Sequence, residues 1–180
     1  LSPSEYPGVP PCLGSTLPPR EQRLFVSLPV LFLSLLSTLL NVTLLRILLV
    51  QKSFIEQNFR RHVVSLVFAS LGYISVNFYA FLPISLFEVR IPDPWLFILA
   101  TPNSFFFQVV QYANLVIAID RLLLFIFPEL HGLMLSNRIL KLVPVSLPWS
   151  ATAFVVLHSS SLGYLKRVNP FTLSYTYACS

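Results

Sequence analysis

An aspartate and an arginine, Asp120 and Arg121, stand next to each other inside a long apolar run of the chain. Six apolar residues follow the pair before Pro128, so both charges are expected within a hydrophobic helix. Charges at membrane depth cost free energy and usually serve a function. An adjacent acid and base can exchange partners, which makes a charge-controlled two-state element. In the alternative interpretation, the Arg121 side chain only extends to the lipid headgroups and marks the membrane boundary.

The same run carries amides along one helical face. At about 100° per residue, five residues fall within an arc of about 80°, namely Asn103, Phe107, Gln111, Asn114 and Arg121. A polar side chain in hydrocarbon is stable only where it faces a partner or water. This face is therefore predicted to point into a bundle, either as contacts between helices or as the wall of a cavity. Gln108, about 140° from Asn103, is expected to face a neighbouring helix.

The residues that commonly serve enzymes are scattered. His62, His131 and His158 stand far apart, and no set of His, Cys, Asp and Glu has the spacing of a metal site. No nucleophile stands beside a matched base. The five glycines form no phosphate-binding loop. We therefore expect a protein that is not an enzyme and that holds no metal or cofactor.

The composition indicates the environment in which these residues act. The chain has 180 residues, of which 55% are hydrophobic and 11% are charged. A soluble domain has about 25% charged residues, so this chain could not cover a globular surface with charge. Its net charge of +5 is not gathered in one basic tract, which disfavours a nucleic-acid partner. We expect a multi-pass membrane protein surrounded by lipid.

Four apolar stretches are long enough for a helix that crosses a bilayer, which needs about 20 residues. Their continuous apolar character favours helices over the strands of a barrel. The predicted fold is an all-α membrane protein with a bundle at 24–164, whose spans lie at about 24–50, 63–87, 96–127 and 139–164. A proline-rich arm at 1–23 precedes the bundle, and a loop at 165–180 follows it.

The distribution of basic residues predicts the orientation, because Lys and Arg favour the cytoplasmic side. With the N-terminus outside, about seven of them lie on the cytoplasmic side and five outside. The same orientation puts Cys12 and Cys179 on the oxidising side, where two cysteines can form a disulfide. We expect a plasma-membrane protein with its N-terminus outside.

The segment around the charge pair is similar to a known family. Residues 118–128, AIDRLLLFIFP, resemble the Asp-Arg-Tyr region of rhodopsin-like G-protein-coupled receptors, and more closely that of the nematode serpentine chemoreceptors, with Leu122 in place of Tyr. Asn41 and Trp149 stand where that superfamily has its first-helix Asn and its fourth-helix Trp. The resemblance covers about residues 24–164. It implies a four-helix transmembrane fragment of a seven-transmembrane receptor bundle, with 165–180 as the start of the second extracellular loop.

The resemblance also implies a function and a set of roles. The protein would be a chemosensory receptor that binds an extracellular small molecule or peptide and signals to a heterotrimeric G protein. The residues of the switch and of G-protein coupling would be Asp120, Arg121, Pro128 and Arg138. The candidates for the ligand cavity are Asn77, Asn103, Phe107 and Gln111. The polar residues of helix packing would be Asn41, Asn114 and Trp149.

The chain departs from the family pattern at two positions. Gly72 stands where the second-helix Asp is usual, which puts the sodium site tied to that Asp in doubt. The third-helix Cys would fall near Leu96 and is absent. Cys179 resembles the loop cysteine that normally pairs with it, so the resemblance implies a disulfide from Cys179 to Cys12 in the arm.

Two other classes of membrane protein stay open. A four-span scaffold of the tetraspan kind would have large, cysteine-rich extracellular loops, whereas the loop at 88–95 is short and has no Cys. Part of a transporter would have helices broken at the midplane, whereas the prolines here mostly lie off it. If the chain is a receptor fragment, four helices cannot form the complete cavity or the G-protein cleft, so we expect no signalling from it alone.

Overall fold

The computed structural model describes residues 18–50, 57–89, 91, 93–137, 140–164, 166–169 and 171–177, and at 93, 94 and 177 it describes the backbone only. Cys12, Cys179, Arg138 and most of the predicted arm lie outside the described residues. The predicted disulfide therefore stays a prediction.

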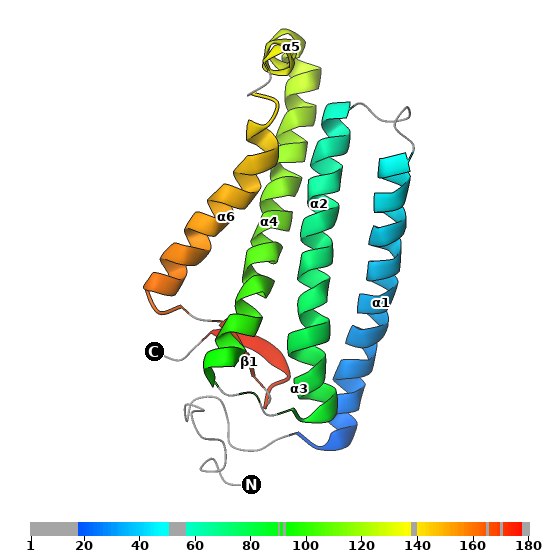
Figure 1. Cartoon of the computed structure of the whole chain (residues 1–180), viewed down its shortest axis with the longest axis vertical. Helices are drawn as coiled ribbons and strands as arrows, with labels where there is room; N and C mark the ends of the chain where they lie inside the picture. The colour runs from blue at the N-terminus through cyan, green and yellow to red at the C-terminus, as the bar shows by residue number, and fades with distance from the viewer. Residues whose placement is uncertain are drawn as a thin grey trace.

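The described chain is mostly helical, and its long helices lie side by side (Figure 1). The α-helices are α1 Arg20–Val50, α2 Gln57–Val76, α3 Leu82–Phe87, α4 Asp93–Ile126, α5 Pro128–Ser136 and α6 Val143–Ser161. Helix α1 packs against α2, α2 against α4, and α4 against α6. The short helix α5 lies at one end of α4, called here the α5 end. A β-hairpin lies at the other, called the hairpin end.

Three helical segments are long and apolar enough to cross a membrane: Arg20–Val50, Gln57–Phe87 and Trp95–Ile126. They confirm the predicted membrane class and its helical architecture. Helix α6 is not among the three, because its 19 residues include several serines and two prolines. Nineteen residues span about 28 Å, close to the thickness of a hydrocarbon core. The fourth span stays a prediction.

The second span changes its winding near its end. A π-helical turn, η3 Asn77–Phe81, joins α2 to α3, and the Leu82 N–H donates to the Asn77 carbonyl five residues back. Pro83 follows directly. A proline inside a helix has no N–H to donate, and its ring clashes with the carbonyl four residues earlier. The wider turn relieves that clash, and π turns of this kind are frequent at functional sites.

Two segments that the sequence predicted only as loops have regular structure. Helix α5 begins at Pro128, whose fixed φ suits the first helical position. Glu129 lies in its first turn, where a negative charge interacts favourably with the positive end of the helix dipole. Strands β1 Lys166–Asn169 and β2 Ser174–Tyr177 pair antiparallel. At their turn, Asn169 Oδ1 accepts hydrogen bonds from the Phe171 and Thr172 amides, the geometry that favours asparagine in turns.

The hairpin is part of the principal core rather than a surface appendage. Val168 of β1 is buried with apolar residues of α2, η3, α3 and α4, namely Val76, Ala80, Phe81, Leu82, Ile84, Leu96 and Ala100. Helix α1, in contrast, exposes a series of large apolar side chains, among them Phe25, Phe32 and Leu39. Such a surface would be a liability in water, whereas lipid tails are as apolar as leucine.

Candidate functional sites at the two ends of α4

At the α5 end, Asp120 of α4 contacts a histidine of the next helix. His131 Nε2 lies 3.2 Å from Asp120 Oδ1, and both side chains are about nine-tenths buried, with 7% and 12% exposed. Because α5 starts at Pro128, directly after α4 ends, its first turn brings His131 back toward Asp120. The carboxylate can only accept a hydrogen bond, so the imidazole donates when its Nε2 is protonated. The scattered positions of the histidines gave no sign of this contact.

Arg121 makes only a long ion-pair contact with Asp120, the residue before it. Its Nε lies 3.8 Å from Asp120 Oδ2, beyond hydrogen-bond distance. Its guanidinium carbon lies 3.9 Å from the centre of the Phe59 ring on α2. A cation over an aromatic face gains about 0.5–2 kcal/mol, depending on how far it is desolvated. In the described structure the two neighbours therefore contact different helices: Asp120 contacts α5, and Arg121 contacts α2.

Several buried polar atoms of Arg121 and of the first turns of α2 have no hydrogen-bond partner among the described residues. They are Arg121 Nε itself, Asn58 Oδ1, Arg60 Nη1 and His62 Nε2. His62 is buried and close enough to interact electrostatically with Asp120 and Arg121. Buried polar groups without partners are rare in folded proteins. The α5 end therefore has unused hydrogen-bonding capacity beside its charge pair.

A cavity of about 220 Å³ lies beside this charge cluster, between α4, α5 and α6. Its walls are mostly apolar, and its polar members are Asn58, Asp120, His131 and Lys141. The described residues contain no group of three or more His, Cys, Asp or Glu side chains placed to hold a metal ion. The charged and titratable groups in contact at this end are the Asp120 carboxylate, the His131 imidazole and the Arg121 guanidinium.

At the hairpin end, Asn103 of α4 accepts a hydrogen bond from a lysine of β1. Lys166 Nζ donates to Asn103 Oδ1 over 2.6 Å, and the same ammonium lies 5.0 Å from the centre of the Tyr175 ring. Asn103 is only 2% exposed, and its Nδ2 has no partner among the described residues. Burial lowers the pKa of the Lys166 ammonium below that of an ordinary lysine. No carboxylate among the described side chains forms an ion pair with Lys166.

Hydrogen bonds and one ion pair connect the hairpin end to the first two spans. The Tyr175 hydroxyl donates to Asn77 Oδ1 over 3.4 Å, and Asn77 Nδ2 donates to Ser34 Oγ of α1 over 3.3 Å. Burial raises the pKa of the Tyr175 phenol, so it stays protonated. Arg23 of α1 forms an ion pair with Glu88 after α3. Asn77, predicted as a cavity residue, thus links η3 to the hairpin and to α1.

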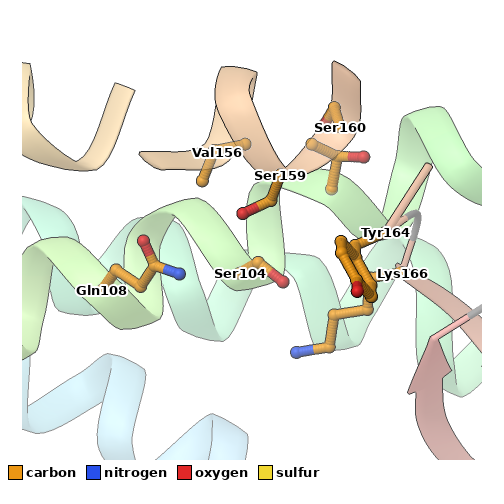
Figure 2. Close-up of a pocket in the computed structure, with 8 residues that line it drawn as sticks. Ser104, Gln108, Val156, Ser159, Ser160, Tyr164 and Lys166 are labelled. Carbon is orange, nitrogen blue, oxygen red and sulfur yellow. The ribbon is translucent and has the colours of Figure 1, made fainter. Parts of the chain in front are cut away.

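A second cavity, of about 340 Å³, lies at the hairpin end between α4 and α6 (Figure 2). Its lining is rich in hydroxyl and amide groups and contains one cation: Thr101, Ser104, Gln108, Val156, Ser159, Ser160, Tyr164 and Lys166. Ser104 Oγ and Gln108 Oε1 are buried without partners among the described residues. Gln108 faces the α6 side, as its angle on α4 predicted.

Only part of the predicted polar face of α4 points into the described bundle. Asn103 is buried, whereas Gln111 and Asn114 are exposed. Phe107 is also exposed, with its ring centre 6.0 Å from that of Tyr73. Asn114, predicted as a helix-packing residue, is covered by no described element, so its packing role stays a prediction. Lys166 was not among the predicted site residues, because a residue in a predicted loop gives no sign that a hairpin will bring it to Asn103.

The other two predicted packing residues differ from each other. Trp149 Nε1 of α6 donates to Ser65 Oγ of α2 over 2.8 Å, which is the predicted contact between helices. Asn41, in contrast, donates to the Ser37 carbonyl one turn earlier in its own helix. Short polar side chains often bond the preceding turn in this way. The described structure shows the Asn41 amide bonded within its own helix, and its packing against another helix stays a prediction.

At Gly72 the structure shows why a larger residue would be unfavourable. A Cβ added there would lie 2.5 Å from the Phe106 ring of α4. That ring in turn packs edge-on against Phe105 and Trp149. The position that the resemblance assigned to an Asp is thus closed by an aromatic cluster.

No model of a known protein family matches the chain, and no curated protein matches it in sequence. The two ends of α4 therefore provide the basis for a functional interpretation.

Proposed function

We propose that this chain forms the first four helices of a seven-helix chemosensory receptor that couples an extracellular ligand to a heterotrimeric G protein. The observation that supports this proposal is the arrangement along α4. One continuous helix carries a polar cavity at the hairpin end and a charge cluster at the α5 end. Ser104 and Asp120 are separated by 16 positions, about 24 Å along a helix axis.

The proposed orientation puts the N-terminus and the hairpin outside the plasma membrane. The excess of basic residues at the α5 end supports it, because Lys and Arg favour the cytoplasmic side. In this orientation the ligand enters under the hairpin, and the G protein docks where Asp120, Arg121 and α5 meet. Pro128 starts α5 and so sets the position of His131.

The proposed switch is an exchange of partners at Asp120. Asp120 contacts His131 closely and Arg121 loosely, so a small movement of α5 would change which side chain the carboxylate contacts. Two-state elements of this kind respond to a bound ligand by shifting their populations. Arg121, whose Nε has no hydrogen-bond partner among the described residues, would contact the G protein or the later helices of the bundle.

The proposal is tested by reading the transcript past the codon for Ser180. We expect three further apolar spans in the same frame, with a proline in the sixth and an Asn/Asp-Pro-x-x-Tyr-like segment in the seventh. A stop codon directly after Ser180 in a well-expressed message would contradict the receptor and favour a four-span protein. The 180-residue chain by itself is expected to give no signalling.

A further inference from the structure

We infer that the cavity between α4 and α6 binds a small organic carboxylate, with Lys166 as its counter-ion. This inference names the ligand class of the receptor proposed above and rests on that function. It starts from the charge of the lining, which contains one cation, several hydroxyls and no acidic residue. An anion entering such a cavity meets a complementary potential.

The Lys166 ammonium is already partly desolvated, which strengthens its attraction for an anion. It is half-buried at the start of β1 and donates to Asn103 Oδ1. An ammonium has three N–H donors, and Asn103 takes one of them. A carboxylate would accept another, and a hydrogen bond between two charged groups is stronger than one between neutral groups.

The far side of the cavity supplies positions for the rest of the ligand. Ser104 Oγ and Gln108 Oε1 are buried, and neither has a hydrogen-bond partner among the described residues. Figure 2 shows the side chains of Ser104 and Gln108 on α4, with the Ser159 side chain pointing toward them from α6. A ligand with a hydroxyl or amino group near its carboxylate would satisfy groups on both sides.

The size of the cavity between α4 and α6 suits a small molecule. About 340 Å³ is near the lower end of the range for small-molecule pockets, about 300–1,000 Å³. A peptide would need a longer groove. Helix α6 leans away from α4 toward the hairpin end (Figure 1), so the cavity lies where the two helices diverge.

The inference is tested with the 180-residue chain in lipid nanodiscs, using L-lactate as the probe and lactamide as its uncharged counterpart. We expect lactate, but not lactamide, to raise the unfolding temperature in a concentration-dependent way. Lys166→Met should weaken lactate binding at least about tenfold, and Lys166→Arg should retain most of it. Lys141→Met, which changes a cation of the other cavity, is the matched control and should bind normally.

A second variant keeps the test independent of the stability of the hairpin. Gln108→Leu leaves Lys166 in place and is expected to weaken lactate binding several-fold. Equal binding of lactate and lactamide, or unchanged lactate binding in both Lys166→Met and Gln108→Leu, would overturn the carboxylate site. Because the readout is binding to the chain itself, a failure here leaves the G-protein proposal standing. A failure of the transcript test likewise leaves the binding result intact.

Discussion

The carboxylate of Asp120 lies nearer to a histidine on another helix than to the arginine beside it in sequence. His131 Nε2 is 3.2 Å from Asp120 Oδ1, whereas Arg121 Nε is 3.8 Å from Asp120 Oδ2. The short contact joins α4 to α5 across the proline that starts α5. The longer one leaves the Arg121 guanidinium over the Phe59 ring. Asp120 therefore contacts both α5, through His131, and Arg121, so its contacts depend on the positions of both.

The Asp120–His131 contact should be measurable as a coupling energy. A double-mutant cycle of Asp120→Ala and His131→Ala, read by unfolding of the chain in detergent, is expected to give about 0.5–3 kcal/mol. Replacing Leu133, an exposed residue of α5, with Ala provides the control and should show no coupling to Asp120. Strict additivity of the Asp120 and His131 changes would show that the contact contributes nothing to stability.

A side chain at Gly72 should destabilise the protein. Gly72→Ala puts a methyl group 2.5 Å from the Phe106 ring, and overpacking of this kind costs about 1–3 kcal/mol. The matched control is Gly132→Ala in α5, where nothing lies within 4 Å of the added Cβ. That change should be neutral or stabilising, because alanine favours a helix by up to about 1 kcal/mol. Thermal unfolding of both variants makes the comparison, and equal stabilities would contradict the packing described.

Trp149 should connect α6 to α2 through its indole N–H. Trp149→Phe keeps the aromatic contacts with Phe105 and Phe106 but removes the donor to Ser65. We expect a loss of about 0.5–1.5 kcal/mol. Ser65→Ala should cost a similar amount, and the double variant should cost less than the sum. A double variant that is fully additive would mean that the two groups do not share a hydrogen bond.

The binding of carboxylate should depend on pH through Lys166. Burial lowers the pKa of its ammonium, so the charge is lost below the ordinary lysine pKa of about 10.4. Lactate affinity is therefore expected to fall with rising pH, starting below that value. Tyr175, which faces the ammonium, keeps its proton because burial raises its pKa. A titration of lactate binding against pH measures the effect, and a flat profile up to pH 10 would exclude Lys166 as the counter-ion.

The membrane class and the long helices could be predicted from the sequence, because apolar length alone decides whether a helix can cross a bilayer. The same holds for the direction of Gln108. Each of these follows from a property of one helix, its hydrophobicity or its 3.6-residue period.

The parts that could not be predicted depend on contacts between segments. His131 meets Asp120 only because Pro128 starts a new helix that folds back, and Lys166 meets Asn103 only because a hairpin turns at Asn169. Asn41 was assigned to another helix by analogy, although its amide can bond its own backbone. The sequence shows that Gly72 stands where the family has an Asp, but not that the Phe106 ring leaves no room for a side chain there.

The most direct test of the receptor is G-protein activation by the longest natural product of the gene that contains this chain. It would be read by energy transfer between labelled G-protein subunits in cells, at matched surface expression. We predict that Asp120→Asn raises basal activation several-fold and that Arg121→Ala reduces it to background. Phe125→Leu, at a position that is 81% exposed, should leave it unchanged. Identical activation by the natural protein, Asp120→Asn and Arg121→Ala would contradict the proposed function.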